Sequence, residues 1–212
     1  MNQHQQTVQV WDILVRIFHW SLVIAFAVAY LTSEEDNPIH IYAGYTVLGL
    51  ISFRVIWGFL GSRYARFSDF VSSPSTVISY IQSILKGNPK HYTGHNPAGG
   101  WMVIAMLIVL FVVTLSGLKL YAIEDGKGPL AINMQLISPI ASVHAEENDL
   151  VENNMEFSSE DSEHFWEETH EVSTNIMLLL IAGHIAGIVI AGKLHKESLI
   201  KAMLTGKKDL KK

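Results

Sequence analysis

The chain has 212 residues, of which 49% are hydrophobic and only 17% are charged. Soluble domains usually contain about 25% charged residues, so the composition excludes an ordinary soluble protein, and the high apolar content excludes a largely disordered one. The formal net charge is −5, and cysteine is absent. Disulfides, iron–sulfur clusters, thiolate metal sites and covalently attached haem are therefore excluded, and metal ligands must come from histidine, methionine or carboxylates.

Four long, nearly uncharged stretches follow one another along the chain. They cover residues 13–32, 39–60, 100–121 and 172–192. A helix of about 20 residues, rising about 1.5 Å per residue, crosses a hydrocarbon core of about 30 Å. The rest of the chain is too short to cover four such helices as a soluble core. We therefore predict an all-α fold, an integral membrane four-helix bundle that forms a single domain over residues 1–212.

Basic residues gather on one side of the predicted membrane. All but two of the 15 Lys and Arg residues lie near the span ends on that side, in the connection 61–99 or after residue 192, and the exceptions are Lys119 and Lys127. Positive-inside bias therefore predicts that both termini and the connection 61–99 lie in the cytoplasm. The acidic connection 123–168 is predicted as an outer loop, which folds either alone or only against a partner.

Two short segments outside the spans have amphipathic patterns. Residues 74–86 follow Ser72-Ser73 and end at Gly87-Asn88-Pro89, which are the signals of a capped helix. Residues 194–204 repeat the pattern, with lysines on the polar side. We predict that both segments lie on the cytoplasmic membrane surface.

Four histidines lie within or at the ends of the predicted spans, where ionisable side chains are costly and tend to mark function. His19 and His184 lie at similar depths toward the cytoplasmic side, whereas His40 and His170 lie at the outer starts of the second and fourth spans. His170 and His184 are 14 residues apart, so a helix carries them on one face about 21 Å apart. Two pairs at two depths suit two haem groups with bis-imidazole ligation. The alternative is that each histidine is a hydrogen-bonded packing residue.

Small and basic residues near these histidines have two interpretations each. Gly44, Gly183 and Gly187 either leave room for a porphyrin edge or permit close helix packing in lipid. Arg16 and Arg54 either neutralise haem propionates or anchor the span ends by the positive-inside rule. The sequence leaves both pairs of alternatives open.

A polar turn, Gly94-His95-Asn96-Pro97, precedes the third span. His95 and Asn96, together with Arg54, supply polar groups for a quinone site beside the bilayer. The alternative is that the turn only starts the helix. The third span has no histidine at apolar depth, so we predict that it packs against the other helices of the bundle and binds no iron.

Several stretches of the chain form a specific pattern when they are taken together. They are VWDILVRIFHW from Val10, HIYAGY from His40, FRVIWGFLGSRYARFSDF ending at Phe70, GHNPAGGWM from Gly94, ETHEVSTNIMLLLIAGHIAG from Glu168, and LHKESLIKAMLTGKK near the C-terminus. This pattern resembles the bacterial cytochrome b561 and nickel–iron hydrogenase-type cytochrome b family. The resemblance covers residues 10–208 and is weakest over 123–163.

The resemblance implies an integral four-helix cytochrome of the bacterial inner membrane with two b haems, whose ligands come from the first, second and fourth helices. Carried over residue by residue, it gives the inner haem to His19 and His184 and the outer haem to His40 and His170. No ligand of the family pattern is missing from this sequence.

These features predict a di-haem membrane cytochrome that transfers electrons between the quinone pool and a periplasmic partner, such as a basic c-type cytochrome attracted by the acidic outer surface. A superoxide-oxidising quinone reductase is the first alternative, because some relatives look like such enzymes, although the outward acids would repel that anion. A membrane-anchor subunit of a hydrogenase or dehydrogenase and a metal-ion transporter that uses the histidines are further alternatives. Membrane lipid is the expected surrounding, and no nucleic-acid partner is expected.

Overall fold

The computed structural model describes residues 7–33, 37–87, 89–131 and 149–209, with side chains from residue 160 to 208 in the last range. In the described part of the chain, four helices are long and apolar enough to span a membrane: α1 (Ile13–Leu31), α2 (Pro38–Leu60), α5 (Pro97–Glu124) and, within α8 (Asp149–His195), the part Glu160–His195. The predicted all-α fold and membrane helix bundle are therefore confirmed. The orientation of the termini stays a prediction.

The first two spans begin where the sequence provides polar caps. α1 follows Asp12, whose carboxylate accepts a hydrogen bond from the Val15 amide at 2.9 Å. α2 begins with Pro38 after Asn37, whose side chain accepts a hydrogen bond from the Ile39 amide at 3.0 Å. Such caps satisfy amides that the first helical turn leaves unpaired, and proline fits there because it has no amide hydrogen to place.

α8 begins well before the predicted span 172–192. Part of the predicted loop 123–168 is therefore helical, from Asp149 onward, while residues 132–148 lie outside the described residues. Neither proline nor glycine occurs between Asp149 and Gly183, and the frequent glutamates are good helix formers. A polar helix thus continues the apolar one, and hydropathy alone does not detect it.

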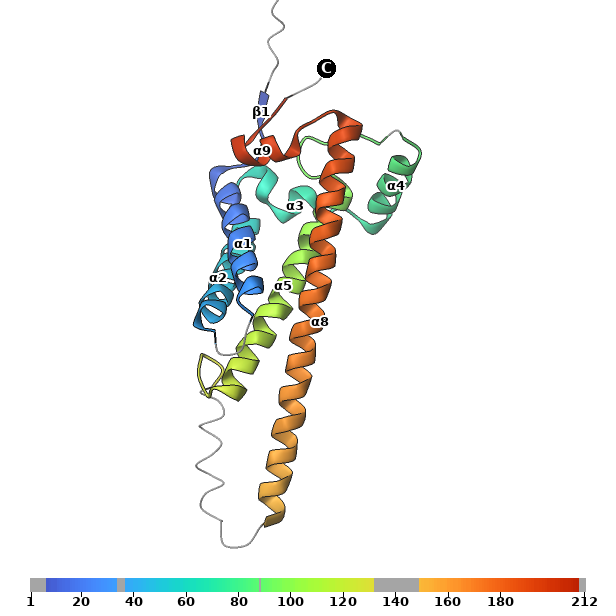
Figure 1. Ribbon diagram of the computed structural model, residues 1–212. Coiled ribbons are helices and arrows are strands. Elements are labelled where there is room, and N and C mark those ends of the chain that lie inside the picture. Colours follow the sequence, from blue (N-terminus) through green and yellow to red (C-terminus); the bar gives the residue numbers. More distant parts are fainter. Residues whose placement is uncertain (1–6, 34–36, 88, 132–148, 210–212) are drawn as a thin grey trace, which may run out of the picture. The chain divides into compact units, whose positions relative to one another are not determined.

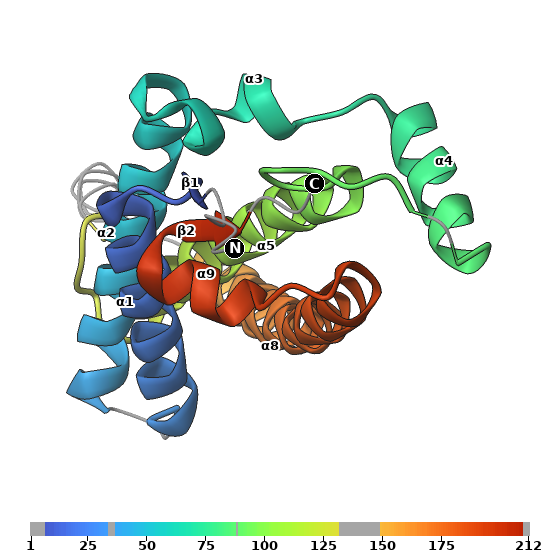
Figure 2. The same cartoon turned by 90° about the horizontal axis from the view of Figure 1, so that it is seen from above.

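The chain divides into two compact units, one formed by residues 1–108 with 178–212 and the other by residues 109–177. In the first unit, α1 and α2 lie side by side (Figures 1 and 2). The buried residues of α2 recur every three or four positions and form a stripe along the helix; they include Ala43, Val47 and Ile51. The single domain predicted over residues 1–212 stays a prediction.

The first unit also contains a small sheet that the sequence did not predict. Strand β1 (Thr7–Gln9) pairs antiparallel with strand β2 (Lys207–Asp209), next to helix α9 (Leu199–Thr205), as Figure 2 shows. A hydrophobic cluster adjoins this sheet and is formed by Val10, Trp11, Val15, Ala65 and Ala202. Ala65 belongs to the short helix η1 (Arg63–Ala65), which follows α2 and precedes α3 (Phe67–Phe70). Segments from both ends of the chain therefore share one core.

The amphipathic segments are helical. α4 (Pro74–Leu85) closely matches the predicted helix 74–86, and its apolar side chains Ile78, Ile81 and Leu85 are exposed. The second segment differs from the prediction, because α8 continues to His195, Lys196 adopts a positive φ of 52°, and α9 begins only at Leu199. The placement of α4 and α9 on the membrane surface stays a prediction.

Candidate functional site

His19 on α1 and His184 on α8 face each other within the first unit. Their ring centres are 6.5 Å apart, with 47° between the ring planes. A metal–imidazole bond is about 2 Å long, so two imidazoles on opposite sides of one metal ion have ring centres about 6 Å apart. The Nδ1 atom of His19 is buried and has no hydrogen-bond partner among the described residues. The spacing of the rings fits a metal centre held between them.

His40, in the first turn of α2, is held by the end of α1. Its Nδ1 atom lies 2.8 Å from the carbonyl oxygen of Ala29. A carbonyl oxygen only accepts hydrogen bonds, so Nδ1 carries the hydrogen and Nε2 carries the lone pair. This is the form in which a histidine binds a metal ion, and a carbonyl at the other nitrogen is the usual partner of such a ligand.

His170 on α8 has the same arrangement within the second unit. Its Nδ1 atom lies 3.0 Å from the carbonyl oxygen of Val113 and 3.0 Å from the hydroxyl of Ser116, both on α5. The Val113 carbonyl again fixes the hydrogen on Nδ1 and leaves the lone pair on Nε2. The pairing of His40 with His170 at one haem stays a prediction.

Sequence reasoning missed the part that α5 plays beside His170. Ser116 is completely buried, with 0% exposure. At Gly117, an added Cβ would lie 3.1 Å from Cε1 of the His170 ring, so the glycine lets the imidazole approach the helix closely. A serine followed by a glycine in an apolar span is a weak signal, because both residues are common where membrane helices pack.

Arg54, near the end of α2, is buried, with 3% exposure. Its Nη2 donates a hydrogen bond to the Ala65 carbonyl at 3.1 Å, and its guanidinium carbon lies 5.1 Å and 5.8 Å from the ring centres of Phe67 and Phe70. Nη1 is buried and has no partner among the described residues. A buried guanidinium N–H without a protein acceptor fits a ligand that brings an oxygen.

Arg16 on α1 has a similar character. Its Nη1 donates to the Thr205 carbonyl at 3.4 Å, whereas its Nε is buried without a partner in the described part of the chain. Both arginines are therefore tied to a backbone carbonyl through one nitrogen and keep a second buried nitrogen available to an acceptor.

His95 lies between two aromatic rings just before α5. Its ring centre is 4.5 Å from that of Trp11 and 4.5 Å from that of Phe70, and its Nδ1 is buried without a partner among the described residues. Burial, with further effects from the positive charges of Arg54 and Lys208 and from His184, lowers the pKa of His95 to about 3. The imidazole is therefore neutral at physiological pH.

Asn96 has a structural role that matches the alternative interpretation of the turn. Its side-chain oxygen accepts a hydrogen bond from the Gly99 amide at 2.7 Å, at the start of α5. Its oxygen is therefore engaged in starting the helix. The structure brings Arg54 and His95 together around Phe70, whereas Asn96 serves the helix terminus.

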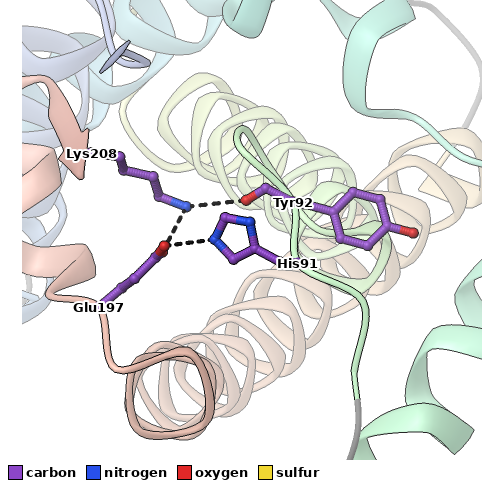
Figure 3. Close-up of polar contacts among 4 residues, drawn as sticks. All are labelled: His91, Tyr92, Glu197 and Lys208. Carbon is purple, nitrogen blue, oxygen red and sulfur yellow. Dashed lines mark hydrogen bonds and ion pairs between the residues drawn. The ribbon is translucent and has the colours of Figure 1, made fainter. Parts of the chain in front are cut away.

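A polar network that the sequence did not reveal fixes the segment just before His95 (Figure 3). The Glu197 carboxylate lies 2.6 Å from Nε2 of His91 and 3.3 Å from Nζ of Lys208, which also donates to the Tyr92 carbonyl at 3.4 Å. The side chains of Glu197 and Lys208 are only 10% and 8% exposed. Burial would raise the pKa of Glu197, but the hydrogen bond from His91 and the charge of Lys208 outweigh it and lower that pKa.

Comparison with known protein families identifies a relationship over most of the chain. Residues 10–206 match the family model described as Prokaryotic cytochrome b561. No curated protein and no solved structure matches the chain.

Proposed function

We propose that this chain, which belongs to the prokaryotic cytochrome b561 family, carries two haem b groups and passes electrons between the quinone pool and a periplasmic redox protein. Family membership and the four apolar helices make it a multi-pass membrane b-type cytochrome of electron transfer. The two haems, the quinone and the periplasmic partner are our additions, each supported by particular residues.

The spacing of His19 and His184 is the observation that carries the proposal. Imidazole centres 6.5 Å apart suit axial ligation of one haem iron from both sides. When bound, the haem supplies a one-electron change between ferric and ferrous iron. Arg16 and Arg54 would hold its propionates, because each keeps a buried N–H without a protein acceptor in the described fold.

The second haem would be held by His40 and His170. Backbone carbonyls of Ala29 and Val113 hold these rings in the tautomer that presents Nε2 to a metal ion. The family resemblance pairs the same two residues. A Cβ added at Gly44, one turn after His40, would meet no described atom within 4 Å, in agreement with space for a flat cofactor.

The quinone would bind at His95 and Arg54. Quinone carbonyl oxygens accept hydrogen bonds, and both side chains have a buried nitrogen without a protein partner in the described fold. His95 is neutral at physiological pH, so it offers a ring N–H without placing a second positive charge beside Arg54. Because its pKa is about 3, His95 would orient the quinol through a hydrogen bond and would not itself hold the released proton at physiological pH.

A basic protein is the partner that the charge distribution favours. Acidic residues dominate the connections opposite the basic ones, and Lys127, one of the few basic residues there, is paired with Asp125 at 3.3 Å. Complementary charge raises the rate of encounter with a basic c-type cytochrome and does not favour an anion such as superoxide.

A measured haem-to-protein ratio tests the proposal directly. The pyridine haemochrome of the full-length protein, purified in detergent, should give two haem b per chain. His19→Ala, His184→Ala, His40→Ala and His170→Ala should each lower the ratio toward one, because each removes an axial ligand. His164→Ala, at an exposed histidine of α8, is the matched control and should keep both haems.

Two results would contradict the proposal. One is a wild-type ratio of one haem or none. The other is an alanine variant of a proposed ligand that still binds both haems with an unchanged low-spin spectrum.

A further inference from the structure

The helix without a span histidine, α5, contributes a buried hydroxyl to the histidine opposite it. The hydroxyl oxygen of Ser116 lies 3.0 Å from Nδ1 of His170, and also 2.9 Å and 3.0 Å from the carbonyl oxygens of Val112 and Val113. All four residues belong to the second compact unit. A serine in a membrane helix often bonds back to a carbonyl of the preceding turn, so the contact with His170 is the feature that requires an explanation.

The direction of each hydrogen bond follows from the carbonyl groups. The Val113 carbonyl can only accept, so the hydrogen of His170 lies on Nδ1. The Ser116 hydroxyl then donates its own hydrogen to Val112 or Val113, and its lone pairs face Nδ1. The imidazole N–H is therefore shared between two acceptors, a carbonyl and a hydroxyl.

We propose that Ser116 is a positioning residue that orients His170 and raises its strength as a haem ligand, so that the haem held by His170 has a lowered reduction potential. An acceptor at the outer nitrogen of a ligating imidazole fixes its ring and makes the ligating nitrogen more basic. A more basic axial ligand stabilises ferric iron relative to ferrous iron. This inference rests on one part of the proposed function, namely that His170 is a haem ligand.

Gly117 supports this assignment independently. A side chain there would begin 3.1 Å and 3.4 Å from Cε1 and Nδ1 of the His170 ring. The first distance is shorter than ordinary van der Waals contact, so a side chain at position 117 would require the ring to shift by a few tenths of an ångström. The Ser116-Gly117 pair thus supplies both the hydrogen-bond acceptor and the space for the imidazole.

The test is a redox titration of the full-length protein, with Ser116→Ala compared with Thr114→Val. Thr114 is the matched control, because its hydroxyl is also buried on α5 and bonds back to the carbonyls of Leu110 and Phe111. Ser116→Ala should retain two haems and raise the midpoint potential of one of them, while the other stays at the wild-type value. Thr114→Val should leave both potentials unchanged.

Further variants separate the possible failures. If Ser116→Ala loses one haem while Thr114→Val keeps both, the positioning role is supported. If Ser116→Ala loses both haems, Ser116→Cys is used in its place. Cysteine has a similar volume but is a weaker hydrogen-bond acceptor, so this variant should raise the midpoint potential of one haem by a smaller amount. Two haems at unchanged potentials in Ser116→Ala, or unchanged potentials in that cysteine variant, would overturn the inference. His170→Ala retaining both haems would instead overturn the assignment of His170 as a ligand.

Discussion

Four buried side-chain nitrogens in the first unit have no hydrogen-bond partner among the described residues. They are Nε of Arg16, Nδ1 of His19, Nη1 of Arg54 and Nδ1 of His95. A buried polar group left unpaired costs about 1–3 kcal/mol, and native folds contain few of them. Haem propionates and a quinone carbonyl would supply acceptors for the nitrogens of Arg16, Arg54 and His95, so the proposed ligands account for three of these four unpaired groups.

Replacing His95 with phenylalanine tests the quinone site at the level of one residue. Phenylalanine keeps the ring between Trp11 and Phe70 but removes the nitrogen that we assign to the quinone. We expect the rate of haem reduction by quinol to fall about tenfold, which corresponds to about 1.4 kcal/mol and is typical of one lost hydrogen bond. Stopped-flow absorbance measures this rate, and reduction by dithionite checks that both haems are present. An unchanged quinol rate would remove His95 from the site.

The same variant should change how stability depends on pH. The pKa of His95 is about 3 in the folded protein and near 6.5 when unfolded, so between these values the unfolded chain binds more protons. Stability therefore falls as pH decreases below about 6.5, and by pH 5 this residue alone lowers it by about 2 kcal/mol. His95→Phe should lose less stability than the wild type between pH 7 and pH 5, as measured by thermal unfolding.

At the residue scale, the candidate ligand histidines could be predicted from the sequence, but the residues that hydrogen-bond to them could not. His19, His40, His170 and His184 could be selected because an imidazole is unusual in an apolar span. Ser116 could not be selected, because serine in a span is ordinary and only the position of His170 gives it a special role. The contact depends on how α5 and α8 pack, and a single sequence does not show that.

At the scale of elements, Asp12 connects the start of α1 to the end of α2. Its carboxylate accepts hydrogen bonds from the Val15 amide, from Nε1 of Trp57 at 3.2 Å and from the hydroxyl of Ser62. Burial alone would raise the pKa of Asp12, but these hydrogen bonds, led by that from Ser62, lower it overall. The carboxylate therefore stabilises the fold above its unfolded pKa, and this contribution is lost as pH falls through the lower folded value.

Asp12→Ala should destabilise the protein by about 1–2 kcal/mol, since it removes a helix cap together with the link to α2. Thermal unfolding in detergent measures the change. Asp69→Ala is the control, because Asp69 pairs only loosely with the exposed Arg63, at 3.7 Å, and such surface pairs contribute about 0–1 kcal/mol. Equal effects of the two substitutions would show that Asp12 does not join the two helices.

The elements themselves were largely predictable where hydropathy and caps agree. α1 and α2 begin within one residue of the predicted positions, because Asp12 and the Asn37-Pro38 pair mark both starts. α8 begins at Asp149 and not at residue 172, because helix formation continues through acidic sequence where hydropathy has already fallen. Helix propensity and membrane preference are separate properties, and the prediction used only the second.

At the scale of the whole molecule, contacts between the two ends of the chain were beyond prediction. β1 and β2 have three residues each and pair across nearly the full length of the sequence. Strands this short show no periodicity from which they could be predicted. A lysine near the C-terminus, such as Lys208, is ordinarily expected to be exposed to solvent. The structure instead buries Lys208 beside Glu197, so a basic tail becomes part of the fold.

Replacing Lys208 with methionine tests whether its ion pair with Glu197 holds the C-terminal strand β2 in place. Removing Lys208 leaves the buried Glu197 carboxylate with its hydrogen bond to His91 but without the lysine charge, so we expect a loss of about 3 kcal/mol in the free energy of unfolding. Lys207→Met is the matched control, because Lys207 is the neighbouring residue of β2 and is exposed, and it should be close to neutral. Adding Glu197→Gln to Lys208→Met should recover part of the loss, because no unpaired buried charge then remains. If Lys208→Met unfolds at the wild-type temperature, the pair does not hold the C-terminal strand in place.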